Sequence, residues 1–201
     1  MTKGVNTEMN DEKKKTTVGF AVTASYCTFS KIFDALPKLC EKYNVIPIVS
    51  YNTQSFDTRF IKAADTLKKL EEITGNTCIR TMTEAEPIGP KALLDLLVIA
   101  PCTGNTLGKI SSGIYDTPVT LAYKSHMRNN RPVLIAVSTN DGLSGSAVSI
   151  GKLLNTRNVF FVPFGQDDPI AKERSLVADF SKLPLACEAA LLNRQLHPIL
   201  L

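Results

Sequence analysis

Short runs of apolar residues alternate with longer segments in which apolar residues recur every three or four positions. The run at residues 17–23 is β-branched and almost wholly apolar, which is typical of a strand covered on both faces of a sheet. Comparable runs predict further strands, of which the second and the third in the chain are the weakest. They lie at residues 45–50, 77–81, 93–100, 132–137 and 159–162.

The segments between these runs have the period of amphipathic helices. Residues 29–41 show it clearly, and Pro37 is expected to kink or break that helix. Pro47 removes one hydrogen-bond donor from the second strand, and Gly75 is placed to end the second helix. Helices are also predicted at residues 61–73, 105–112, 117–129, 146–154 and 176–196, the last interrupted by Pro184.

Strands that alternate with helices in this way predict right-handed crossover connections. The expected fold class is α/β: a three-layer, Rossmann-like sandwich with a mostly parallel sheet and helices on both faces. The length of 201 residues suits one domain. We expect residues 1–16 to be a flexible polar leader, and residues 17–201 to form a single domain that includes a C-terminal helical tail.

Composition narrows the class of protein. Hydrophobic residues make up 44% of the chain and charged residues 21%, an ordinary globular balance. Part of the net charge of +4 lies in Lys13, Lys14 and Lys15, and no basic stripe with stacking aromatics indicates nucleic-acid binding. No apolar stretch approaches the length of a membrane span, so we expect no membrane association.

The five cysteines form no CxxC pair, and no apolar leader precedes them, which favours a reducing cytosol. The two histidines, His126 and His197, are not at ligand spacing from a cysteine pair, so no metal site is expected. We expect His126 to be exposed, because Lys124 and Arg128 flank it.

In parallel sheets the ligand binds beyond the carboxyl ends of the strands, where the strand order reverses. The first such loop begins Thr23-Ala24-Ser25 and lacks the GxGxxG pattern of dinucleotide sites. Its hydroxyl groups, at the start of a helix, can bind one phosphate. The alternative is that Ser25 or Thr28 only caps the helix.

Two later loops carry similar donors. Ser50 and Thr53 follow the second strand without the acidic residue that holds the ribose of NAD, and they suit a ribityl chain or an ordinary polar turn. The loop after residue 100 is the most informative, because a buried strand runs directly into polar residues at a helix start. It reads Pro101-Cys102-Thr103-Gly104-Asn105-Thr106, and the alternative is a capped turn with tight helix packing.

The loop at 101–106, the small-residue helix after it and Asp116 resemble the flavoprotein family of homo-oligomeric flavin enzymes, and so does Val22-Thr23-Ala24-Ser25. The family includes cysteine-type decarboxylases and flavin prenyltransferases, and the resemblance covers about residues 17–163. It implies FMN as cofactor and assembly into a homo-oligomer. The cofactor-binding residues that it implies are Thr23, Ala24, Ser25, Ser50, Thr53, Pro101, Cys102, Thr103, Asn105, Thr106 and Ser138.

The chain departs from both enzyme groups. The decarboxylases use a histidine that has no counterpart before His126, and an Asn in a Pro-x-Met-Asn segment, of which Asn140 retains only the Asn. Ser138 stands where the prenyltransferases have an arginine. The catalytic residues therefore stay unknown at this point.

Four segments instead resemble the dipicolinate-forming branch of the family: 24–29, 50–53, 138–143 and 162–169. That branch implies an A subunit that carries NAD(P), dihydrodipicolinate as substrate, and the mother-cell cytoplasm of a spore-forming bacterium. The alternatives are an independent FMN-dependent decarboxylase or prenyltransferase, and a scaffold subunit without flavin.

Three further side chains allow both a functional and a structural interpretation. A helix N-terminus would lower the thiol pKa of Cys102, but no base is near it in sequence, so packing is the preferred interpretation. Lys109 is interpreted as a solvated helix lysine rather than a phosphate ligand. Asp168 is expected to cap a helix that starts at Pro169.

Overall fold

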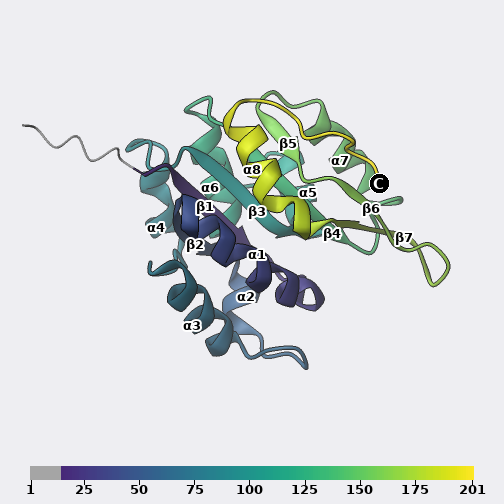
Figure 1. The fold of residues 1–201 in the computed structure, drawn as a ribbon, viewed down its shortest axis with the longest axis horizontal. Coiled ribbons are helices and arrows are strands. Elements are labelled where there is room, and N and C mark those ends of the chain that lie inside the picture. The colour runs from purple at the N-terminus through teal and green to yellow at the C-terminus, as the bar shows by residue number, and fades with distance from the viewer. Residues whose placement is uncertain (1–14) are drawn as a thin grey trace, which may run out of the picture.

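The computed structural model describes residues 15–201, in which a seven-stranded sheet lies between two layers of helices (Figure 1). The leader predicted at residues 1–16 lies almost wholly outside the described residues. Five strands run parallel in the order β2-β1-β3-β4-β5, which confirms the mostly parallel sheet. Their bounds are β1 (Thr17–Val22), β2 (Asn44–Val49), β3 (Leu96–Cys102), β4 (Val133–Thr139) and β5 (Val159–Phe161).

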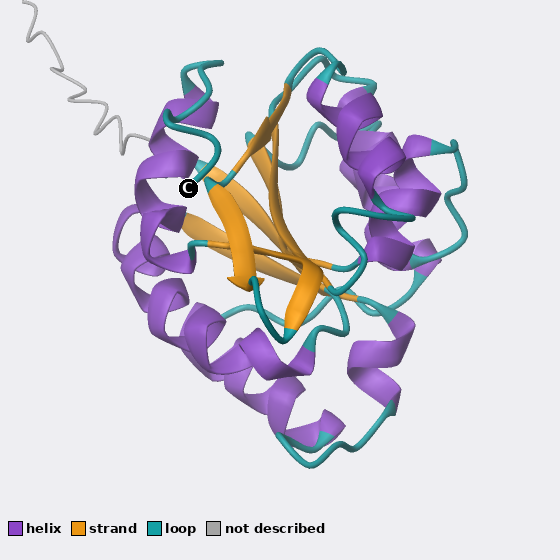
Figure 2. Ribbon diagram, turned by 90° about the vertical axis from the view of Figure 1, so that its right-hand side faces the viewer, coloured by secondary structure: helices purple, strands orange, loops and turns teal. Residues whose placement is uncertain are grey.

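Helices cover both faces of this sheet, as the sequence predicts (Figure 2). One layer holds α1 (Phe29–Lys42), α3 (Ala63–Thr74) and α8 (Leu183–Leu191). The other holds α5 (Gly104–Ser111), α6 (Pro118–Met127) and α7 (Ala147–Leu154). The short helices α2 (Tyr51–Ser55) and α4 (Met82–Ala85) follow β2 and precede β3.

The central strands are apolar at every position because both of their faces are covered. All residues of β1 and β3 are buried, and in β4 only Thr139 is partly exposed. A strand with one face in water would alternate apolar and polar residues, whereas a doubly covered strand cannot. The continuous apolar runs in the sequence therefore become the middle of the sheet.

Two prolines have smaller effects than expected. The break expected at Pro37 does not occur, since α1 continues through it while Phe33, Leu36 and Leu39 bury its apolar face. The carbonyl of Pro47 accepts from the Ile79 N–H at 2.8 Å. Both backbone groups of a strand residue point the same way, so the missing N–H of Pro47 faces Ile79 and costs the β1–β2 ladder nothing. The strand predicted at 77–81 is reduced to a bridge at Ile79.

The segment after β5 differs most from the prediction. Instead of starting a helix, Asp168 closes the turn between β6 (Phe164–Asp168) and β7 (Lys172–Ala178). Its carboxylate accepts from the N–H groups of Ile170 and Ala171 at 3.1 and 2.9 Å. This hairpin projects from the sheet (Figure 1), and β7 pairs antiparallel with the end of β4. The helix predicted from 176 begins only at Leu183, with Pro184 in its first turn.

The prediction that His126 is exposed is wrong, because the residue is fully buried. It continues the stripe formed by Val119, Ala122 and Tyr123 on the buried face of α6, while the flanking basic residues point elsewhere. Its Nε2 donates to the carbonyl of Pro132 at 2.8 Å, and its Nδ1 has no partner among the described residues. Burial lowers the pKa of His126 to about 4, so the ring is neutral near pH 7.

Within residues 15–201 no helix has both the length and the apolar character of a membrane span. The same part of the chain holds no group of three His, Cys, Asp or Glu side chains arranged to bind a metal ion.

Candidate functional site

The strand order reverses between β1 and β3, and the loops that follow these two strands meet there. After β1 the chain crosses to β2 on one side, whereas β3 pairs with β1 on the other. Thr23 joins the two loops: its hydroxyl donates to the Pro101 carbonyl at 2.7 Å and accepts from the Thr103 N–H at 3.1 Å. The loops predicted from sequence to bind a ligand are thus brought together at the position where sheets of this type bind one.

A cavity of about 440 Å³ opens beside this junction, at the N-terminal ends of α2, α5 and α6. Ser50, Thr103 and Thr117 cap these helices through their side-chain hydroxyls. The first N–H groups of a helix have no partner within it and carry the positive end of its dipole. We call this the first cavity; it is lined by Thr23, Ala24, Ser50, Tyr51, Asn52, Thr103, Asn105, Thr106, Lys109, Asp116 and Thr117.

Lys109 is the one lysine of the first cavity. It is not solvated as expected: its Nζ lies 2.7 and 2.8 Å from the two carboxylate oxygens of Asp116. That hydrogen bond is the main cause that holds the pKa of Asp116 below its ordinary value. Because the two charges offset each other, the first cavity offers an anion mainly neutral donors.

A second cavity, of about 500 Å³, adjoins the first at Ala24 and Thr103. Ser25 and Ser138 meet in its wall with their hydroxyl oxygens 2.7 Å apart, which joins the loop after β1 to the end of β4. We call it the second cavity. Its lining comprises Ala24, Ser25, Tyr26, Cys27, Thr28, Lys31, Phe60, Thr103, Ser138, Thr139, Asn140, Asp167, Lys172, Ser175, Leu176 and Val177.

The loop after β4 is fixed against the start of α5. The carboxylate of Asp141 accepts from the hydroxyls of Thr139 and Ser146, and these bonds lower its pKa. Gly104 has no side chain at the point where this cluster approaches most closely. This contact holds Thr139 and Asn140, which line the second cavity, against the start of the helix whose first residues line the first cavity.

Of the residues implied by the family resemblance, Thr53, Pro101 and Cys102 line neither cavity. The Thr53 hydroxyl donates to the Val22 carbonyl at 3.2 Å. The Pro101 carbonyl accepts the hydrogen bond from the Thr23 hydroxyl. Cys102 is buried, and burial raises the pKa of its thiol well above the ordinary value, so the lowered pKa expected from its position is wrong. Packing explains this cysteine.

The remaining predicted residues do line the cavities. Six face the first: Thr23, Ala24, Ser50, Thr103, Asn105 and Thr106. Ser25 and Ser138 face the second. Nothing in the sequence pointed to Lys31, Phe60, Lys172 and Ser175, which come from a helix, a loop and a strand that the carboxyl-end rule does not cover.

Replacing the buried Thr23 with valine is expected to lower the free energy of unfolding by about 1–2 kcal/mol, because the half-buried Thr103 N–H loses its acceptor. Thr23→Ser keeps the hydroxyl and should cost much less. Urea unfolding of the two variants beside the wild type measures the difference. Equal stability of the valine variant and the wild type would show that the two loops do not depend on this hydroxyl.

The fold and the site define a flavin-type protein: residues 6–171 match the model of the family described as Flavoprotein, and the chain belongs to that family. It is 45% identical over 184 residues to the B subunit of dipicolinate synthase of Bacillus subtilis (strain 168), a match that covers 91% of this chain and 92% of the relative. The crystal structure of the corresponding dipicolinate synthase B subunit from Bacillus halodurans superposes with a TM-score of 0.85 at 40% identity. That match covers 92% of this chain and 96% of the other.

More distant structures share the fold. The FMN-dependent cysteine decarboxylase SpaF has a TM-score of 0.63 at 17% identity, covering 89% of this chain and 96% of that one. The FMN-binding protein AtHal3 has a TM-score of 0.61 at 20% identity, covering 87% and 98%. These two likenesses support the fold class alone.

Proposed function

We propose that this chain is the B subunit of a dipicolinate synthase and acts with a separate A subunit that binds NAD(P). The two relatives at 45% and 40% identity carry that name. The structural observation that carries the proposal is the pair of adjoining cavities at the reversal of strand order, which offers room for a cofactor beside a small substrate.

The reaction is the oxidation of dihydrodipicolinate to dipicolinate, which removes one hydride and one proton from the ring. The nicotinamide of the A subunit accepts the hydride in this proposal. In this proposal the present chain binds and orients the substrate and does not transfer its proton, because none of its histidines lines either cavity. The chain would act in the mother-cell cytoplasm of a spore-forming bacterium, as a homo-oligomer.

The first cavity suits the phosphate and ribityl chain of FMN. Helix N-termini and hydroxyls are the usual phosphate ligands in proteins, and here Ser50, Thr103 and Thr106 supply them at one end of the sheet. Thr23 and Asn105 add donors along the wall. Bound flavin would supply a redox-active ring, and these side chains would hold its phosphate end.

The rival proposal of an independent decarboxylase lacks support in the site. The decarboxylases of the family use a histidine, whereas His126 is buried in α6. The prenyltransferases have an arginine where Ser138 makes its hydrogen bond with Ser25. A scaffold without flavin would keep the cavities but bind no cofactor, and a titration separates it from the present proposal.

Titration of the chain with FMN, followed by flavin fluorescence and thermal melting, is expected to show saturable binding at micromolar concentrations or below. Thr106→Val removes a hydroxyl from the first cavity and should weaken binding about tenfold. The matched control is Thr66→Val in α3, which removes a buried hydroxyl that lines neither cavity. Absence of saturable binding to the wild type would overturn the cofactor assignment and favour the scaffold.

The subunit role has its own test. Mixing the chain with the A subunit, dihydrodipicolinate and NAD(P)⁺ should form reduced nicotinamide, whereas this chain alone should form none. Turnover by the A subunit alone at the full rate, or by this chain alone, would contradict the proposal.

A further inference from the structure

The second cavity differs from the first in its charge. Two ammonium groups line it, from Lys31 on α1 and Lys172 on β7, against the single carboxylate of Asp167. That carboxylate lies 2.5 Å from the Lys172 Nζ and is therefore already engaged. Lys31 makes no ion pair with any residue from 15 to 201. The cavity thus presents one cation without a counter-charge and a second one that is shared with a carboxylate.

The neutral groups of the second cavity suit the polar edge of a small ring. When Ser25 and Ser138 bond to each other, one hydroxyl hydrogen is used between them and the other is left to donate to a ligand. Asn140 adds an amide to the same wall. Phe60 contributes an aromatic ring that is 53% exposed, and the Arg59 guanidinium lies 4.8 Å from the centre of that ring.

We infer that the second cavity binds a small planar ring that carries two carboxylates, the class to which dihydrodipicolinate and dipicolinate belong. Lys31 and Lys172 each pair with a carboxylate, and the Ser25–Ser138 pair donates to the ring edge. The inference rests on the proposed function, and it assigns the substrate to this chain rather than to the nicotinamide-binding partner. A ligand here would adjoin one in the first cavity at Ala24 and Thr103.

Asp167 gives the inference a directional test. Its carboxylate competes with a bound carboxylate for the Lys172 ammonium, and it repels any dianion that enters the second cavity. Removing its charge should therefore strengthen binding, whereas removing either lysine should weaken it. A purely structural role for these three exposed side chains would not produce opposite signs.

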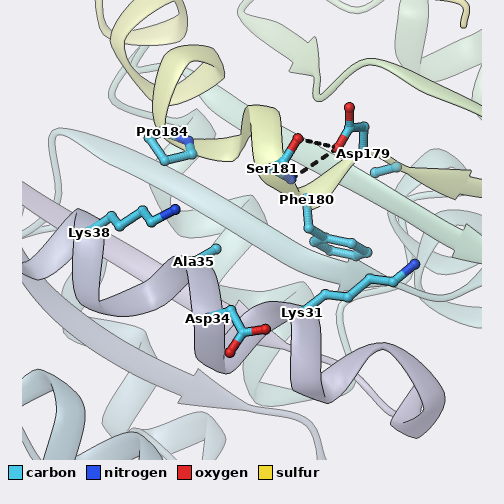
Figure 3. Close-up of a pocket in the computed structure, with 9 residues that line it drawn as sticks. Lys31, Asp34, Ala35, Lys38, Asp179, Phe180, Ser181 and Pro184 are labelled. Atoms are coloured by element: carbon cyan, nitrogen blue, oxygen red, sulfur yellow. Dashed lines mark hydrogen bonds between the residues drawn. The ribbon is translucent and has the colours of Figure 1, made fainter.

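The chain offers matched controls for both lysines. In Figure 3, Lys31 extends from α1 beneath Phe180, and Lys38 extends from the same helix beneath Pro184. Both residues line an open groove of about 340 Å³. Lys31 lines both that groove and the second cavity, whereas Lys38 lines the groove alone. Lys42, paired with Glu188, matches Lys172 in exposure, since their side chains are 57% and 53% exposed, and it lies outside the second cavity.

Isothermal titration of the full chain with dipicolinate, with and without FMN, is the experiment. Lys31→Gln and Lys172→Gln are each expected to weaken binding about three- to tenfold, and Asp167→Asn to strengthen it about threefold. Lys38→Gln and Lys42→Gln should bind as the wild type does. Picolinate, which has one carboxylate, should bind more weakly than dipicolinate. Its affinity should fall by a smaller factor when either lysine is replaced.

The inference is overturned if dipicolinate shows no saturable binding, or if neither lysine substitution changes its affinity. Weakening by Lys38→Gln equal to that by Lys31→Gln would place the anion in the groove of Figure 3 instead and would also overturn it. The proposed function fails by a different result, since absence of turnover with the A subunit would leave the dicarboxylate binding data unaffected.

Discussion

Replacing Gly104 with alanine is expected to weaken FMN binding more than tenfold and to destabilise the fold by about 1–3 kcal/mol. The added Cβ would lie 2.6 Å from the Ser146 and Thr139 hydroxyl oxygens and 2.8 Å from an Asp141 carboxylate oxygen. Both hydroxyls donate to the Asp141 carboxylate, so none of the three groups can move aside without breaking a hydrogen bond. The start of α5 must shift, and with it the donors that line the first cavity. FMN titration and thermal melting measure both effects.

Gly108 provides the control in the same helix. A Cβ at this position meets nothing within 4 Å, so Gly108→Ala should bind FMN normally and gain up to about 1 kcal/mol from helix propensity. If Gly104→Ala bound FMN as tightly as Gly108→Ala does, the contact between the loops after β3 and β4 would be irrelevant to the cofactor.

Lowering the pH from about 7.5 to about 4 is expected to reduce the free energy of unfolding by about 3 kcal/mol through His126 alone. Desolvation by burial, the largest cause, lowers the pKa of this residue in the folded chain from 6.5 to about 4. Between these values the unfolded chain binds a proton that the folded chain does not. The contribution of His126 to the free energy of unfolding is therefore fully present above pH 6.5 and is lost as the pH falls towards 4.

Urea unfolding at a series of pH values measures this loss. His126→Gln keeps an amide that can donate to the Pro132 carbonyl but cannot titrate, so its stability should vary less over this range. His197→Gln, at an exposed position near the C-terminus, should reproduce the wild-type profile. The assignment to His126 fails if both variants follow the same curve as the wild type.

The loops after β1 and β3 could be recognised from the sequence because they carry a local signal. A doubly buried strand must be apolar throughout, so the point where polarity returns marks its carboxyl end. Thr103 and Thr106 stand at that point, three residues apart, as the capping of α5 requires. Family resemblance then related the same residues to FMN, and both line the first cavity in the folded chain.

The sequence held no comparable signal for the second cavity. Lys172 and Ser175 lie on β7, in a segment where the sequence was interpreted as a helix that starts at Pro169 and not as a strand. Its first three residues are exposed and charged, so its strand conformation depends on pairing with β6 and with the end of β4. Such pairing is a long-range interaction that the local pattern does not encode.

His126 shows, within one helix, the same contrast between what the local sequence pattern determines and what the tertiary structure determines. The spacing of apolar residues determined that α6 exists and which stripe of it faces the sheet, because helical periodicity is a local property. Whether the last position of that stripe is in water depends on how far the covering layer extends. Only the tertiary structure decided that the ring lies beneath the Pro132 carbonyl and loses its charge, since burial is set by segments remote in sequence.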